Sequence, residues 1–129
     1  MAIARIEVIG GLTSGEKRER LDAVHEAMVA ALRVPSDDPT VLITEIDPGS
    51  VVLPGGVGDS YTIVQITMFE GRSIEAKRAL YRGICTSLAA VGIPPSDILI
   101  AIVEAPTGNW GIAGGTPASE VELGFQVEM

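Results

Sequence analysis

Residues 34–37 read "VPSD" and residues 94–97 read "PPSD", so nearly the same turn recurs sixty positions along the chain. Sliding the sequence against itself by sixty residues, without a gap, also places Gly11 on Gly71. Proline cannot continue a helix, so each Pro-Ser-Asp turn should follow the end of a helix. The self-alignment therefore predicts one structural unit that occurs twice.

The segments between these landmarks show the same order of patterns in both halves. A stretch that alternates apolar with polar or small residues, typical of a half-buried strand, comes first. An amphipathic stretch with apolar residues three and four apart follows, and then a segment rich in β-branched residues. In chain order these segments are 2–9, 15–34 and 40–46 in the first half, and 62–69, 74–93 and 97–105 in the second.

Hydroxyl residues stand where both predicted helices begin. Thr13 or Ser14 precedes the first helix, and Ser73 precedes the second. Such residues accept hydrogen bonds from the free N–H groups of a first helical turn. Glu16 and Glu75 lie within those first turns, where the helix dipole favours a negative charge. Both helices thus have an N-terminal capping signal.

Each half is predicted to be strand–helix–strand, and a crossover of that length makes the two strands parallel and the connection right-handed. The expected fold is α+β: two tandem β-α-β units that form a four-stranded mixed sheet with both helices on one face. We expect a single domain over 1–129, with repeats 1–47 and 61–106, a linker at 48–60, and a C-terminal loop and final strand over 107–129. Two unrelated units of similar length are the alternative.

A sheet with helices on one face only leaves its other face bare, which calls for association of several copies. The formal net charge of −8 disfavours nucleic acid and anionic membrane surfaces as partners. A single cysteine, Cys85, excludes an internal disulfide and suits a reducing compartment. No apolar run is long enough to span a bilayer, so we expect a cytoplasmic protein whose partner is a small molecule. An arginine in a concave site would allow that molecule to be an anion despite the net charge.

The sequence resembles the tautomerase superfamily, in particular its fused branch of about 130 residues, which includes malonate semialdehyde decarboxylase and cis-3-chloroacrylic acid dehalogenase. The resemblance rests on "GRSIEAKRALYRGI" (71–84), "NWGIAGG" (109–115) and the opening residues 1–48. It implies a MIF-like homotrimer with inward-facing sheets, and a catalytic amino-terminal proline that becomes terminal on loss of the initiator methionine. It also implies arginines that hold substrate carboxylates, with no metal and no organic cofactor.

The chain departs from that pattern at three positions. Ala2 stands where the family has its proline, Leu12 occupies the first copy of the arginine position that Arg72 keeps in the second, and Phe69 occupies another position that often carries arginine. If Met1 is removed, the Ala2 amine becomes terminal, with an ordinary pKa of about 7.7–8.0 that burial would lower. Such an amine can act as a general base or form a Schiff base. Ala2 could equally be only the first strand residue.

Six further residues complete the predicted site. Arg72 can bind a carboxylate bidentately. Phe69 and Trp110 would shape a pocket, with Asn109 as a carbonyl donor, although Trp110 could instead form a subunit contact and Phe69 could be core. Asp38 and Glu45 are the carboxylates expected to orient water or act as an acid.

Three functions follow from this set of residues. The first is a cofactor-independent, tautomerase-like isomerase that moves a proton next to the carbonyl of a small acid. The second is a trimeric binding or scaffold protein that lost the chemistry of the N-terminal proline. The third is a pathway-specific isomerase or cyclase in which Asp38, Glu45 or His25 replaces the amine.

Overall fold

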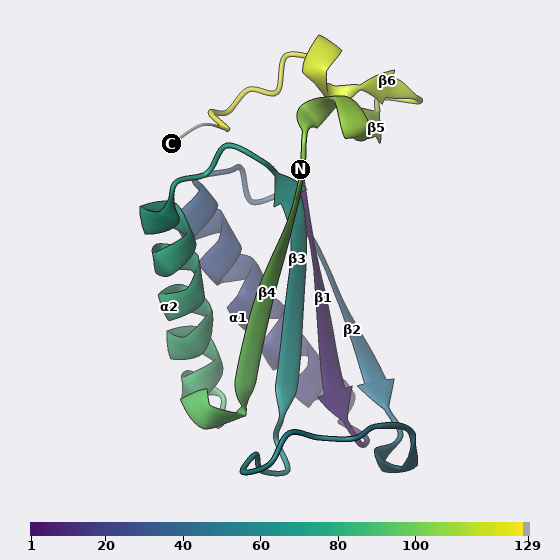
Figure 1. Cartoon of the computed structure of the whole chain (residues 1–129), viewed down its shortest axis with the longest axis vertical. Coiled ribbons are helices and arrows are strands. Elements are labelled where there is room, and N and C mark those ends of the chain that lie inside the picture. The colour runs from purple at the N-terminus through teal and green to yellow at the C-terminus, as the bar shows by residue number, and fades with distance from the viewer. Residues whose placement is uncertain (128–129) are drawn as a thin grey trace.

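The computed structural model describes residues 1–127 and shows a sheet covered by two helices (Figure 1). Short 3-10 turns at Pro48–Ser50, Pro95–Asp97, Thr107–Asn109 and Ala118–Glu120 connect the longer elements. The helices and strands, in chain order, are β1 (Ala2–Ile9), α1 (Ser14–Leu32), β2 (Thr40–Ile46), β3 (Thr62–Phe69), α2 (Ile74–Ala90), β4 (Ile98–Ala105), β5 (Gly111–Ile112) and β6 (Thr116–Pro117).

The four long strands form one mixed sheet in the order β2-β1-β3-β4. β1 and β2 run parallel, as do β3 and β4, while β1 and β3 meet antiparallel at the centre. In the central pair Arg5 lies opposite Gln65, and these two residues are themselves sixty positions apart. The two units are therefore related by an approximate two-fold axis through the Arg5–Gln65 pair, which confirms the predicted duplication.

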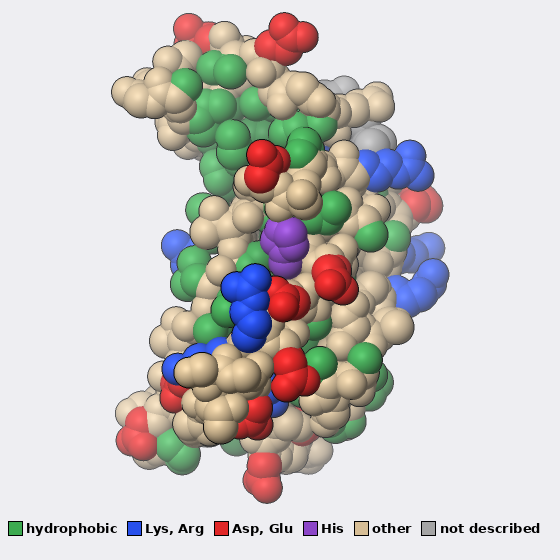
Figure 2. Space-filling view, turned by 180° about the vertical axis from the view of Figure 1, so that it is seen from behind, with side chains coloured by type: hydrophobic (Ala, Val, Ile, Leu, Met, Phe, Trp, Pro, Cys, Tyr) green, Lys and Arg blue, Asp and Glu red, His purple; other side chains and the backbone are tan. Residues whose placement is uncertain are grey.

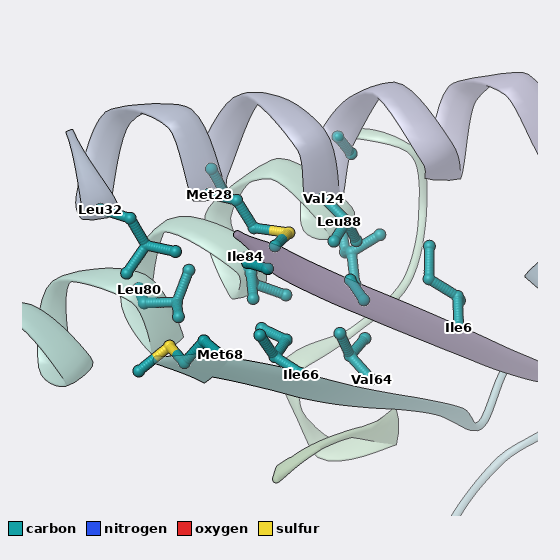
Figure 3. Packing of buried hydrophobic residues seen from close by; sticks show 14 of the residues in the cluster. Ile6, Val24, Met28, Leu32, Val64, Ile66, Met68, Leu80, Ile84 and Leu88 are labelled. Atoms are coloured by element: carbon teal, nitrogen blue, oxygen red, sulfur yellow. The ribbon is translucent and has the colours of Figure 1, made fainter. Parts of the chain in front are cut away.

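Both helices lie on the same face of the sheet and bury an aliphatic core beneath them (Figure 1, Figure 3). The two helices meet where Gly83 of α2 faces Ala27 of α1, and a β-carbon on Gly83 would make an ordinary contact of 3.5 Å with the Cβ of Ala27. The largest side chains in this core come from both helices and both central strands: Ile6, Val24, Met28, Leu32, Val64, Ile66, Met68, Leu80, Ile84 and Leu88.

The predicted helix starts are confirmed. Thr13 caps α1: its hydroxyl accepts from the backbone N–H of Glu16 at 3.1 Å, and the Glu16 carboxylate accepts from the Thr13 N–H at 3.0 Å. These reciprocal bonds satisfy two backbone donors that the helix itself leaves free. Ser73 caps α2 in the same way, accepting from the Ala76 N–H at 3.1 Å. α1 ends at Arg33, which adopts the left-handed conformation with φ of 53°.

The linker between the units is held down by Asp97, which the sequence identified only as a turn residue. Its buried carboxylate accepts from the Gly58 N–H at 2.7 Å and from the Ser60 hydroxyl at 2.7 Å. The backbone hydrogen bond from Gly58, followed by that from Ser60, lowers the pKa of this carboxyl. The repeat-related Asp37 is exposed, so the two turns differ in what they do.

The prediction of a final strand is wrong: no such strand is present in the part of the C-terminal segment that the structure describes. Only the two-residue strands β5 and β6 form after β4, and they pair with each other. Residues 121–127 contain no strand and run past the ends of the helices, where Phe125 packs against the core (Figure 1). A strand requires an edge partner, and this segment has none within residues 1–127; residues 128–129 lie outside the described part.

The face of the sheet opposite the helices carries exposed apolar side chains. Leu42 of β2 is 36% exposed, and Leu99 and Val103 of β4 are 50% and 44% exposed. This is the bare face expected from the sequence. Within the described residues, neither helix has the length and apolar composition required to cross a bilayer.

Candidate active site

The predicted site lies at the end of the sheet where β1 begins and where β3 and β4 end, which we call the first pole. The antiparallel register places Ala2 opposite Met68, beside Phe69 at the end of β3. Ala2 is 4% exposed and Phe69 is 2% exposed, so this end of the sheet is well packed. The fold thus delivers the start of the chain to the surroundings of Phe69, as the sequence predicted.

The N-terminal amine, here on Met1, lies 3.4 Å from a carboxylate oxygen of Asp38. The Asp38 side chain is only 7% exposed, and the residue lies in the turn that leads into β2. Burial lowers the pKa of the amine, the Asp38 charge partly opposes that effect, and the Arg72 charge lowers it further. The result is an amine that loses its proton more readily than an ordinary N-terminus.

The Asp38 oxygen nearest the amine, Oδ2, has no hydrogen-bond partner among residues 1–127. Its 3.4 Å contact with the amine is therefore an ion pair rather than an aligned hydrogen bond. A buried carboxylate oxygen without a donor costs free energy, so Oδ2 is available to water or to a ligand that carries a proton. This property suits the acid–base role predicted for Asp38.

Arg72 lies between the two units, immediately before the Ser73 cap of α2. Its guanidinium donates from Nη1 to the Leu32 carbonyl at 2.6 Å, and the residue is 8% exposed. A cation here stabilises the free carbonyls at the end of α1. Burial lowers the pKa of Arg72, while the nearby Asp38 charge opposes that shift. One of its N–H groups is therefore committed to the fold, and the others remain for a ligand.

Trp110 packs onto Phe69 and forms an apolar wall of the first pole. The two rings meet edge to face, with centroids 5.2 Å apart and an interplanar angle of 78°. The indole Nε1–H donates to the Ala105 carbonyl at 3.4 Å, which fixes the loop to the end of β4. Asn109 is exposed beside it. Figure 2 shows hydrophobic side chains gathered where the C-terminal segment meets the body of the molecule.

Glu45 does not lie at the first pole of this chain. It is opposite Val8, near the end of β1, and forms an ion pair with Lys17 of α1. The six residues from Ala2 to Val8 place it about 20 Å from the start of the strand. The sequence already indicated that Glu45 would be far from Ala2, because parallel strands start at the same end of the sheet and Glu45 is near the end of its strand. His25 lies on the surface of α1, where its Nε2 is 2.7 Å from the Ser36 carbonyl in the turn that also contains Asp38.

The structure adds a charge pair at the first pole that sequence reasoning missed. Lys77 of α2 lies 2.8 Å from Glu104 of β4, and Glu104 is opposite Met68. Lys17 forms a similar pair with Glu45 in the other unit, one position beyond Thr44, the repeat equivalent of Glu104. The sixty-residue alignment places Lys77 on Lys17, and this was the available signal. Among residues 1–127 no group of three or more His, Cys, Asp or Glu side chains is arranged to hold a metal ion.

The architecture agrees with comparisons to known proteins. Two family models, each described as "Tautomerase enzyme", match residues 38–113 and 3–59. Since the first match alone spans more than half of the chain, the chain belongs to the tautomerase family. The 2-hydroxymuconate tautomerase of Comamonas testosteroni is 44% identical over 61 residues, which are 46% of this chain and 92% of that protein.

Solved structures of the same architecture cover almost the whole chain. Malonate semialdehyde decarboxylase FG41, inhibited by 3-bromopropiolate, is 30% identical with a TM-score of 0.81, over 89% of this chain and 92% of that one. A fused 4-OT described as a symmetric trimer is 24% identical with a TM-score of 0.81, over 91% of this chain and 96% of that one, and shows the fold alone. The predicted superfamily and fold are confirmed.

Proposed function

We propose that this protein is a tautomerase-like isomerase that catalyses proton transfer next to the carbonyl group of a small acid, without a cofactor. The observation that carries the proposal is the charged surroundings of the start of β1: the half-buried Met1 amine lies 3.4 Å from the Asp38 carboxylate and within the influence of the Arg72 charge, and the Ala2 amine would replace it one residue further in. An amine with a lowered pKa loses its proton more readily than an ordinary N-terminus, which favours its action as a general base.

The chemistry is a shift of one proton with no net change in charge. In the enol-to-keto direction, the neutral amine takes the proton from the enol hydroxyl. The electron pair left on oxygen forms the C=O bond, and the electron pair of the C=C bond moves to the adjacent carbon, where the new C–H bond forms. The ammonium group, or Asp38 if it has taken that proton through Oδ2, then delivers a proton to the adjacent carbon. One O–H bond breaks and one C–H bond forms, so the enzyme returns to its starting state.

The remaining first-pole residues bind the substrate. The free N–H groups of Arg72 hold its carboxylate, and the negative charge that develops on the carbonyl oxygen is stabilised by the same guanidinium. Phe69 and Trp110 form the apolar wall, and the exposed Asn109 is placed to donate to a carbonyl. Glu45, at the other end of β1, takes no part within one chain.

The amine belongs to Met1 in this chain, and removal of Met1 would transfer it to Ala2. That change moves the amine by one strand residue, about 3.3 Å, toward the packed interior. Ala2 is small and 4% exposed, so the new amine would be more strongly desolvated than the present one. We propose that the processed form with Ala2 at its terminus is the active one.

The experiment is the ketonisation of phenylenolpyruvate, followed by its ultraviolet absorbance, on protein whose N-terminal residue is fixed by intact mass. We expect kcat/KM to rise with pH through a pKa below the ordinary 8.0, because burial disfavours the ammonium form. Asp38→Asn should lower kcat, and Arg72→Lys should mainly raise KM, since lysine keeps the charge but loses the bidentate fork. Asp37→Asn, one residue away and exposed, is the matched control for Asp38. Wild-type rates in both Asp38→Asn and Arg72→Lys would refute the site.

We further propose that the working form is a homotrimer assembled through the bare sheet face. Leu42, Leu99 and Val103 supply exposed apolar surface there, and fused 4-OT, which shares the fold, is described as a trimer. Light scattering coupled to size exclusion should give three times the mass of the chain. Leu99→Lys should lower that mass, since it places a charge within the proposed interface.

One observation favours a second candidate, a binding or scaffold protein without catalysis. Arg72 already bonds the Leu32 carbonyl, and Phe69 fills the position beside Ala2, so both serve the fold as well. The phenylenolpyruvate assay separates the two functions. Binding of phenylpyruvate without any turnover, in protein that lacks Met1, would favour the scaffold.

A further inference from the structure

The opposite end of the sheet, where β1 and β2 end and β3 and β4 begin, contains a cavity that the proposed reaction does not use. We call this end the second pole. The cavity has a volume of about 230 Å³, and its walls include Leu12, Arg20, Asp59, Tyr61 and Thr62. The two poles are separated by the length of β1, about 25 Å.

The internal two-fold axis relates the second pole to the first residue by residue. Thr62 occupies the place of Ala2, and Tyr61 occupies the place of Met1. Because the chain continues through Tyr61 rather than starting there, the second pole has no amine. Any function of this cavity must therefore differ from that proposed for the first pole.

At two pairs of repeat-equivalent positions, one pole has an arginine where the other has a leucine. The first pole has Arg72 and, eight residues later, Leu80; the second pole has Leu12 and, eight residues later, Arg20. Leu80 is completely buried, whereas Arg20 is half-buried and borders the cavity. Each pole thus keeps one guanidinium of these two pairs: Arg72 lies just before the cap of α2, and Arg20 lies within α1.

The Arg20 guanidinium is incompletely paired by the protein. Nη1 donates to the Glu16 carbonyl at 3.2 Å, and the Glu16 carboxylate is engaged with the Thr13 N–H. Nε is buried and has no hydrogen-bond partner within residues 1–127. No carboxylate of the described chain lies within ion-pair distance of Arg20, and Asp59 at the rim is exposed. A buried cationic donor without a partner is unfavourable, and an anion would satisfy it.

We propose that the second-pole cavity binds a small monocarboxylate that also carries a hydrogen-bond donor, such as a 2-hydroxy acid. Arg20 holds the carboxylate, and Asp59 accepts from the ligand's hydroxyl group. The apolar walls formed by Leu12 and Ile9 accommodate a short hydrocarbon part. A dicarboxylate is disfavoured, because its second charge would face Asp59. This site is independent of the isomerase function and of the first pole.

The test is a titration of isotope-labelled full-length protein with sodium lactate, with ionic strength held constant by sodium chloride. We expect saturable amide shifts at Gly11, Leu12, Tyr61 and Thr62. Arg20→Gln should weaken binding about tenfold, the loss expected for one charge-assisted contact. Arg18→Gln is the matched control: it lies on the same helix, its side chain is 75% exposed, and it pairs with Asp22 away from the cavity. Its affinity should equal that of the wild type.

Arg20→Lys retains the charge without the planar fork and should bind lactate with intermediate affinity. If Arg20→Gln does not fold, the affinity of Arg20→Lys tests whether Arg20 holds the carboxylate. The proposal is overturned by equal affinity in wild type and either Arg20 variant, by shifts confined to Ala2 and Arg72, or by identical shifts with chloride alone. If the wild-type protein shows no phenylenolpyruvate turnover but still binds lactate, the isomerase proposal is refuted and the second-pole site is not.

Discussion

The contact between Phe69 and Trp110 predicts a measurable coupling between the end of β3 and the loop after β4. The rings lie 5.2 Å apart in an edge-to-face arrangement, and Phe69 is 2% exposed. Phe69→Leu removes part of a buried ring and should cost about 1–2 kcal/mol of the free energy of unfolding. Trp110→Leu should cost less, because Trp110 is only half-buried. An aromatic pair of this geometry contributes about 1 kcal/mol beyond the buried area.

The double variant should therefore be about 1 kcal/mol more stable than the sum of the two single losses predicts. For a chain of this length, that corresponds to about 4 °C in Tm. The assay is urea unfolding followed by far-ultraviolet circular dichroism, at one protomer concentration, since association would otherwise shift the apparent stability. The control is Met28→Leu, in the distant core, combined with Trp110→Leu: the losses in the free energy of unfolding of these two variants should add. Losses for Phe69 and Trp110 that add within about 0.3 kcal/mol would refute the coupling.

Three further predictions concern single residues. Thr13→Ala should lower the free energy of unfolding by about 1 kcal/mol because it removes the cap of α1, whereas Ser14→Ala should change little; chemical unfolding compares them. Asp97→Asn should increase hydrogen exchange in the linker 47–60 and lower Tm at neutral pH. Because hydrogen bonds from Gly58 and Ser60 hold the pKa of Asp97 below 3.8, its stabilisation is present above that value and lost as the pH falls through the lowered pKa, so wild type and variant should converge there. Burial raises the pKa of the Cys85 thiol, so alkylation of the native protein at pH 8 should be slower than that of the unfolded chain.

The sequence predicted the sheet and its helices because those features are written in local patterns that occur twice. The alternation in 2–9 and 62–69, the capping residue Ser73 and the repeated Pro-Ser-Asp turns each act within a few residues. The parallel pairing within each unit then follows from the length of its crossover. The neighbourhood of Ala2 and Phe69 depends on the antiparallel pairing of β1 with β3, which the structure shows and the crossover length does not determine.

The details that could not be predicted depend on contacts between distant parts of the chain. Asp97 holds Gly58 across 39 residues, and Arg72 bonds Leu32 across 40, and neither partner carries a local signal. The final strand was wrong because residues 121–127 pair with neither of the free sheet edges, β2 and β4, although the local alternation is typical of a strand. The partnership of Asp38 with the amine also needed coordinates, since Asp38 has no counterpart at the same position in the second unit, where Ile98 follows Asp97.

The account depends most on a proton-accepting amine at the start of β1, and selective carbamoylation of that amine by cyanate near pH 7 tests it directly. The lowered pKa makes the N-terminus react before the lysines, and peptide mass spectrometry locates the adduct. We predict that protein modified only at its N-terminus retains its fold and loses at least a hundredfold in kcat on phenylenolpyruvate, in line with the contribution of a general base. Undiminished turnover by fully carbamoylated protein would contradict the account.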